Sequence, residues 1–170
     1  MGVNNAVSAF LIPMIQIDFN SQKRRLGLLI VLLSGSTGVF AQVLTPVKWS
    51  YAAKKTSNTE AVVFLKATIE DGWHIYSTKQ KDGGPVKTSF TFKPLDGYVL
   101  QGKVSEPEPV TKYEPSFVMD VHYFEHSVVF QQKIKLKQAQ AVVKGQLEFM
   151  VCNDQKCLPP EDVDFRIAVK

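Results

Sequence analysis

Hydrophobic and polar residues alternate along most of the chain after residue 42. Such alternation, with a period of two, is typical of strands that bury one face and expose the other. It predicts four long strands, over residues 60–69, 126–136, 146–152 and 163–169. Shorter runs predict four more, over residues 47–52, 73–77, 88–92 and 98–104. In the strand at 126–136, one face carries Val128, Phe130, Ile134 and Leu136, with the polar Gln132 between them.

Turn-forming residues separate these runs, and no segment has the periodicity of an amphipathic helix. Examples are Asp71-Gly72 and Asp82-Gly83-Gly84-Pro85. About eight short strands with regular turns predict an all-β fold, an immunoglobulin-like β-sandwich. Residues 106–120 are expected to form the longest irregular connection, although they carry apolar side chains that a simple linker would not need.

The first 41 residues differ from the rest and resemble an export signal. A basic cluster, Lys23-Arg24-Arg25, precedes an apolar run at 26–33, and Val39 and Ala41 fit a signal-peptidase site. That run is shorter than the roughly 20 residues needed to cross a bilayer. We therefore interpret 1–41 as an N-terminal extension and signal peptide with cleavage near Ala41. Residues 42–170 are then one periplasmic domain that does not span the membrane; the alternative is an uncleaved anchor.

Composition supports a folded domain and argues against one class of partner. The chain is 45% hydrophobic and carries a net charge of +4. Three of its basic residues and one acidic residue precede residue 42, so the remainder has a mild net charge of +2. Nucleic-acid binding needs a clustered basic face, so we expect no nucleic-acid partner.

The chain has two cysteines, Cys152 and Cys157, with the polar loop Asn153-Asp154-Gln155-Lys156 between them. In an oxidising compartment two cysteines are expected to pair, and a hairpin would bring them within disulfide distance. Closing so short a loop stabilises a fold less than closing a long one. Pro159 and Pro160 stiffen the backbone after Cys157, and Lys156 favours its thiolate form.

Two interpretations of this pair remain open on the residues alone. Spacing slightly favours a structural disulfide, which would make the protein a redox-inert, immunoglobulin-like binding or adaptor module. The short loop instead favours a redox-active pair. We expect no metal, because the three histidines show no ligand spacing relative to the cysteines. A hydrolase or sugar-binding domain has no Ser-His-Asp arrangement or spaced carboxylate pair in its favour.

A family resemblance favours the redox interpretation. Over most of residues 44–170 the chain resembles the N-terminal periplasmic domain of the thiol:disulfide interchange protein DsbD. The resemblance rests on three motifs: Asp71-Gly72-Trp73-His74-Ile75-Tyr76, then Asp82-Gly83-Gly84-Pro85, and above all the run from Val151 through Cys152 and Cys157 to Pro160. The loop between the cysteines looks one residue shorter than in the best-known members.

The resemblance implies an immunoglobulin-like sandwich that acts as a thiol–disulfide redox carrier of the protein-disulfide reductase type. Such a domain passes reducing equivalents to thioredoxin-fold partners, in pathways such as cytochrome c biogenesis, without a cofactor. Cys157 would be the exchanging sulfur, and Cys152 would resolve the mixed disulfide. No membrane electron-transfer domain follows in this sequence, so we expect a stand-alone version with a separate membrane electron donor of the DsbD type.

The resemblance also implies neighbours for the cysteine pair. A cap loop with an aromatic residue shields the pair in that family, and the match here is Phe117 first and Tyr113 second. Glu114 is the nearest acid for handling protons, and Tyr76 and His74 occupy positions where the family places aromatic residues. The residues themselves favour core positions for Trp73 and Phe149.

Overall fold

The computed structural model describes residues 44–170. The predicted signal peptide and its cleavage point lie outside these residues. Every regular element of the described part is a β-strand. The strands are β1 (Val47–Lys55), β2 (Glu60–Ile69), β3 (His74–Tyr76), β4 (Ser89–Phe92), β5 (Tyr98–Ser105), β6 (Val110–Glu114), β7 (Met119–Glu125), β8 (Ser127–Leu136), β9 (Ala141–Phe149), β10 (Val151–Cys152) and β11 (Glu161–Val169).

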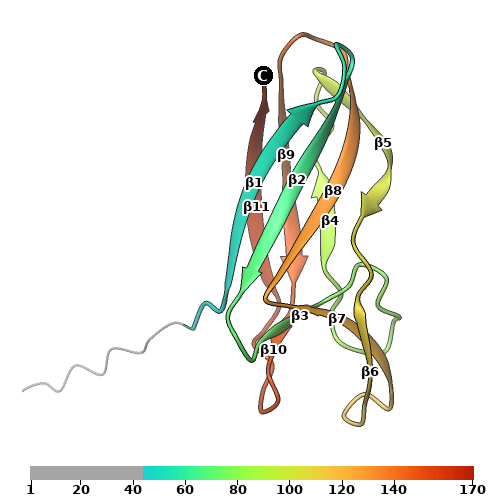
Figure 1. Ribbon diagram of the computed structural model, residues 1–170, viewed down its shortest axis with the longest axis vertical. Helices are drawn as coiled ribbons and strands as arrows, with labels where there is room; N and C mark the ends of the chain where they lie inside the picture. The colour runs from blue at the N-terminus through green and yellow to red at the C-terminus, as the bar shows by residue number, and fades with distance from the viewer. Residues whose placement is uncertain (1–43) are drawn as a thin grey trace, which may run out of the picture. The chain divides into compact units, whose positions relative to one another are not determined.

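The strands form three antiparallel sheets. One has the order β1-β2-β8-β5, and a second has the order β11-β9-β4; together these make the long body of the molecule (Figure 1). The third, with the order β10-β3-β7-β6, lies at one end of that body (Figure 1). The prediction of an all-β sandwich is confirmed.

Alternating apolar residues of the two long sheets form the core. The Phe130 ring centroid lies 5.0 Å from that of Phe90 and 6.0 Å from that of Trp49, and Phe149 packs against Trp49 with centroids 5.5 Å apart. Burying one such side chain contributes about 1.5–3 kcal/mol. Trp73 and Phe149 are buried, as predicted.

Gln132 lies on the apolar face of β8 and is only 1% exposed. Its side-chain amide donates to the carbonyl oxygens of Gln101 at 3.1 Å, Gly102 at 3.4 Å and Lys133 at 2.7 Å. The β5–β8 register shifts between Gln101 and Ser105, and Gly102 has a φ of +69°. The buried amide therefore satisfies carbonyls that the bulge removes from the ladder.

Two long strands bend where they enter the third sheet. The predicted strand over 146–152 divides at Met150 into β9 and β10, which belong to different sheets. Likewise His126, with a φ of 57°, separates β7 from β8. These bends carry the chain out of the sandwich and build the end sheet from strand continuations.

The expectation of an irregular connection over 106–120 is wrong, because residues 110–125 form the antiparallel hairpin β6–β7. Its β7 strand also pairs with β3, with Tyr123 opposite Tyr76. The half-buried carboxylate of Glu106 accepts hydrogen bonds from the Ser77 hydroxyl and the Thr78 N–H, which fixes the entry to the hairpin. Tertiary pairing thus orders a segment whose prolines suggested a loop.

Candidate functional site

The end sheet presents two faces of opposite character. Because strand residues alternate between faces, Ile75, Phe124 and Val151 point into the main core. Their neighbours point to the other side, where Tyr76, Val121 and Cys152 form a second, smaller buried cluster. Cys152 therefore lies in its own apolar environment, apart from the sandwich core.

Cys152 and Cys157 form a disulfide, with Cα atoms 4.0 Å apart and directly opposed across a short hairpin. The predicted pairing and its hairpin geometry are present. Cys152 is 2% exposed, whereas Cys157 is exposed to solvent. The two sulfurs of one bond thus differ sharply in access.

The hairpin is held by hydrogen bonds that do not involve sulfur. The Asn153 N–H donates to the Lys156 carbonyl at 2.9 Å, and the Leu158 N–H donates to the Val151 carbonyl at 2.9 Å. The Asn153 side-chain oxygen accepts from the N–H groups of Gln155 and Lys156 at 2.9 and 2.8 Å. Asn favours such turns because its side chain can cap the backbone two residues on. These four hydrogen bonds hold the loop in addition to the disulfide.

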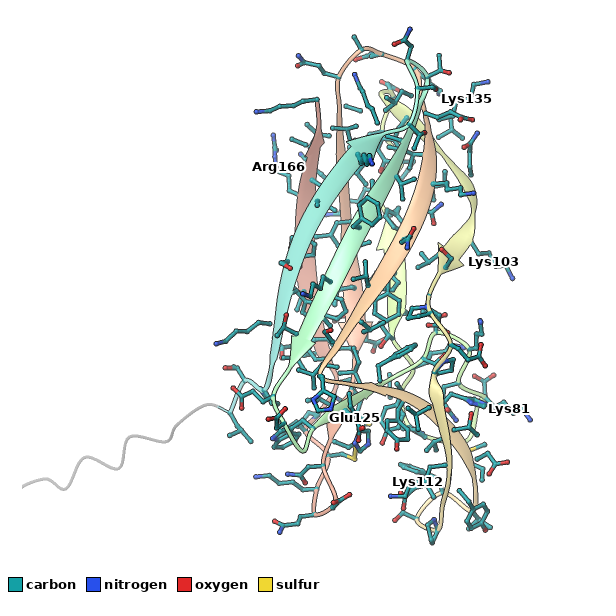
Figure 2. All side chains as sticks on the ribbon, in the orientation of Figure 1. Lys81, Lys103, Lys112, Glu125, Lys135 and Arg166 are labelled. Atoms are coloured by element: carbon teal, nitrogen blue, oxygen red, sulfur yellow. A yellow bond between two sulfur atoms is a disulfide. The ribbon has the colours of Figure 1, made fainter. Side chains whose placement is uncertain are left out.

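A groove of about 560 Å³ separates the cysteine hairpin from the β6–β7 hairpin. The disulfide and residues 153–156 line one wall, and residues 112–117 line the other. His74, Tyr76, Val121, Tyr123 and Glu125 of β3 and β7 complete the lining. Figure 2 shows Glu125 and Lys112 at this end of the molecule.

His74 and Tyr76 lie beside the buried sulfur. His74 pairs with Cys152 across the β10–β3 ladder, and its Nε2 is 3.2 Å from the Tyr76 hydroxyl oxygen. Burial lowers the pKa of His74, and it raises the pKa of Tyr76 to about 12 with a further contribution from the charge of Glu114. Both side chains are therefore neutral at pH 7.

The two aromatic cap candidates differ in their contacts. Phe117 is half-buried and packs against the cluster that contains Cys152. Tyr113 is 56% exposed. Glu114 is half-buried and also lines the groove. Of the two, Phe117 has the contacts that a shielding role requires.

The loop that follows β3 supports the floor of the groove. Gln80 is 3% exposed, and its side-chain oxygen accepts from the His122 N–H of β7 at 2.8 Å. The Thr88 hydroxyl donates to the Tyr76 carbonyl at 2.6 Å. These contacts fix β3 and β7, which carry His74, Tyr76 and Tyr123 of the groove lining.

All seven residues that the sequence suggested for the site line this groove: His74, Tyr76, Tyr113, Glu114, Phe117, Cys152 and Cys157. The sequence interpretation missed Lys112, Val121, Tyr123 and Glu125. Alternation of Met119, Val121 and Tyr123 with polar neighbours was the signal that could have revealed β7. Phe124, which follows Tyr123 and faces the sandwich core, breaks this alternation and hid the strand.

Two further properties concern the described residues only. Residues 44–170 contain no group of three or more His, Cys, Asp or Glu side chains arranged to hold a metal ion. The same residues contain no helix long and apolar enough to cross a membrane.

Comparison with known proteins identifies the family. The family model of the N-terminal part of the thiol:disulfide interchange protein DsbD matches residues 41–168. The chain belongs to this family. Among curated proteins, none matches it. The DsbD N-terminal family thus accounts for nearly all of the described domain, including the cysteine pair.

Solved structures with related folds include DsbD relatives. The N-terminal periplasmic domain of ScsB from Proteus mirabilis has 17% identity and a TM-score of 0.54, over 73% of this chain and 48% of that one. The Neisseria meningitidis DsbD N-terminal domain in the reduced form has 20% identity and a TM-score of 0.46, over 70% and 84%. The same domain in its complex with the PilB N-terminal domain has 19% identity and a TM-score of 0.49, over 74% and 87%.

The similarity to the ScsB domain agrees with the immunoglobulin-like sandwich expected from the strand pattern. The chain spans about half of the ScsB chain. The family match therefore describes this domain and its cysteine pair.

Proposed function

We propose that this domain exchanges thiols and disulfides through Cys152 and Cys157, passing reducing equivalents to partner proteins. The observation that carries the proposal is the unequal access of the two sulfurs, one 2% exposed and the other open to a groove. Thiol–disulfide exchange needs one sulfur that a partner can reach and a second that can resolve the mixed disulfide. Membership of the DsbD family supports the same chemistry.

The exposure of the sulfurs supports different roles for them. In the reduced domain the Cys157 thiolate attacks one sulfur of a partner disulfide, forming a mixed disulfide and releasing the partner's other sulfur as a thiolate. Cys152 then loses its proton and attacks the Cys157 sulfur. The Cys152–Cys157 bond forms, the mixed disulfide breaks, and the partner leaves with two thiols and two more electrons.

The groove supplies the environment for these steps. Phe117 limits access to the buried sulfur, and Tyr113 offers contact area to a partner at the rim. Neutral His74 and Tyr76 keep charge away from Cys152, and Glu114 on the opposite wall accepts the proton that Cys152 releases. Lys156, next to Cys157, favours the attacking thiolate.

The partners we propose are thioredoxin-fold redox proteins, and the electron donor is a separate membrane protein of the DsbD type. The relevant compartment is the periplasm, to which residues 1–41, acting as a signal peptide, would direct the domain. A Neisseria relative forms a complex with the PilB N-terminal domain. A partner domain of that kind would insert its active-site edge between the cysteine hairpin and the β6–β7 hairpin.

A trapping experiment tests the proposal directly. The Cys152→Ser variant keeps the accessible sulfur but cannot resolve a mixed disulfide, so it should accumulate a covalent complex with an oxidised thioredoxin-fold protein. The matched control is Cys157→Ser, which retains only the buried sulfur and should accumulate far less. Non-reducing electrophoresis with mass spectrometry identifies the bond.

The alternative is a redox-inert adaptor with a structural disulfide. It predicts no covalent complex from either variant and a reduction potential below about −300 mV, typical of structural disulfides in secreted proteins. Finding both results would refute thiol exchange. A higher potential together with a Cys157-linked complex would refute the adaptor.

A further inference from the structure

Charge is unevenly distributed along the outer face of the sheet β11-β9-β4. Nearest the cysteine end, Asp162 pairs with Glu148, and Asp164 pairs with Gln146 in the next outward-facing position. Further along, Arg166 pairs with Lys144. One face of one sheet therefore changes from acidic to basic with distance from the disulfide.

The basic part is a row of cations across three strands. The Lys93 N–H donates to the Lys144 carbonyl at 2.8 Å, so Lys93 continues the row of Lys144 and Arg166 beyond the end of β4. Like charges directly opposed across strands destabilise a sheet. Within residues 44–170 the ion pairs are Lys87–Asp82 and His126–Asp71, and neither neutralises the row.

Exposed aliphatic side chains lie beside these cations. Leu95, 40% exposed, lines one groove with Lys144, Arg166 and Lys170, and a second groove with Lys93 and Lys137. Val99 and Leu100, 47% and 40% exposed, line the second groove too. We call this surface the basic end: Lys93, Leu95, Lys137, Lys144, Arg166 and Lys170. Figure 2 shows Arg166 on the sandwich body, far from Lys112 and Glu125 at the disulfide end.

The composition of this surface fits a lipid headgroup layer better than an acidic protein. Protein interfaces are depleted in Lys, and Leu and Val are under-represented among their hot spots, which are mostly Trp, Tyr and Arg. Anionic lipid surfaces attract Lys and Arg together, and neighbouring aliphatic side chains can enter the headgroup layer. Asp96 is the only acidic residue that lines either groove.

We propose that the basic end binds anionic phospholipid headgroups and holds the domain on a membrane surface with its disulfide end turned away. This inference goes beyond thiol exchange and does not depend on it. The domain would remain on the membrane surface while the groove between the two hairpins stays open to partners.

Vesicle co-sedimentation of the oxidised full chain tests the proposal. Vesicles of phosphatidylcholine alone are compared with equimolar phosphatidylcholine and phosphatidylglycerol, so that the difference isolates charge-dependent binding. The test variant combines Lys93→Gln, Lys144→Gln and Arg166→Gln. The matched control combines Lys48→Gln, Lys66→Gln and Lys103→Gln, which remove the same charge from exposed positions elsewhere.

Each cation near an anionic surface accounts for about a fivefold change in partitioning, so the test variant should bind anionic vesicles roughly a hundredfold less. The control variant should bind anionic vesicles within a few-fold of the original protein. High salt should release the original protein and the control from these vesicles. Leu95→Ser should weaken binding without changing its salt dependence. The test variant should unfold at the same or a higher temperature, since it removes like-charge repulsion.

Three results would overturn the proposal. The first is equal binding by the test and control variants, and the second is equal binding to the two vesicle types. The third is that the protein binds neither type of vesicle. That result would overturn the proposal even if the basic end were found to bind an acidic protein. None of these results bears on thiol exchange, because the assay uses the oxidised protein and forms no mixed disulfide.

Discussion

Side chains along β3 and β10 alternate between two environments, the sandwich core and the groove. Ile75 and Val151 face the sandwich core, while His74 and Cys152 face the groove. A shift of the β10–β3 pairing by one residue would exchange these sets and bury the disulfide in the core. The apolar neighbours of Cys152 therefore do more than fill space, because they fix which face the sulfur occupies.

His74 makes stability depend on pH. Burial holds its folded-state pKa below the ordinary value of 6.5, so the unfolded chain binds a proton first as pH falls. The contribution of neutral His74 to the free energy of unfolding should be fully present above about pH 6.5. It should decrease as the pH falls from there towards the folded-state pKa. His74→Gln should reduce this decrease, as measured by urea unfolding at about pH 7.5 and about pH 5.5. An unchanged decrease in His74→Gln, or an equal effect of the control His122→Gln, would contradict this assignment.

At the scale of elements, the β6–β7 hairpin and the cysteine hairpin form the two walls of one groove. Phe117 extends from the first towards the cluster around Cys152, while Val118 at the same tip is 76% exposed with a φ of 55°. The difference between these adjacent residues shows that the tip directs one side chain inward. At the tip of the hairpin, Phe117 is therefore the side chain that packs against the disulfide cluster, whereas Val118 is not.

Removing that contact should open the disulfide to small thiols. Phe117→Ala is expected to speed reduction by dithiothreitol severalfold, because the ring no longer excludes solvent from the cluster. Val118→Ala, at the same tip but exposed, should reduce at the original rate. Stopped-flow measurement of thiol release gives both rates; equal rates for the two variants would exclude a shielding role for Phe117.

Gly145 fixes the packing of β9 between its neighbours. A Cβ at this position would collide with the Thr91 carbonyl of β4 and the Phe165 ring of β11. Gly145→Ala should therefore cost about 2 kcal/mol or more, since a close-packed core resists added volume. At Gly97, by contrast, a Cβ would meet the Ala141 Cβ at an ordinary 3.4 Å. Gly97→Ala should be nearly neutral in denaturant unfolding, and equal losses for the two variants would contradict this account.

At the scale of the whole molecule, the sandwich core and the disulfide contribute separately to stability. The disulfide closes a loop with a sequence separation of 5. On the chain-entropy scale so short a loop is worth about 2 kcal/mol, against 4–5 kcal/mol for a loop of about 100 residues.

Reduction should therefore leave the domain folded. We expect the free energy of unfolding to fall by about 2 kcal/mol in the reduced protein, with an unchanged denaturant slope because the same surface is exposed on unfolding. Urea titrations with and without reductant measure both quantities. Unfolding of the domain on reduction alone would assign the disulfide a structural role instead.

The sequence by itself determined the fold class, most strands and the cysteine pairing. Those features depend on local signals: alternation, turn residues, and two cysteines a short hairpin apart. The seven predicted site residues lie on three short segments, 74–76, 113–117 and 152–157, and all of them line one groove. Pairing of β3 with both β10 and β7 brings these segments together.

Tertiary structure alone decided the rest. Pairing between β3 and β7 and between β6 and β7 made strands of the segment over 110–125, and the long strand divides at Met150 between two sheets. Gln132 and Glu106 likewise act through hydrogen bonds to residues far away in the chain. The difference in exposure between the two sulfurs also appears only in space, because it depends on which face of the end sheet is covered. Sequence specifies the periodicity of a strand, but the neighbouring strands decide what each face contacts.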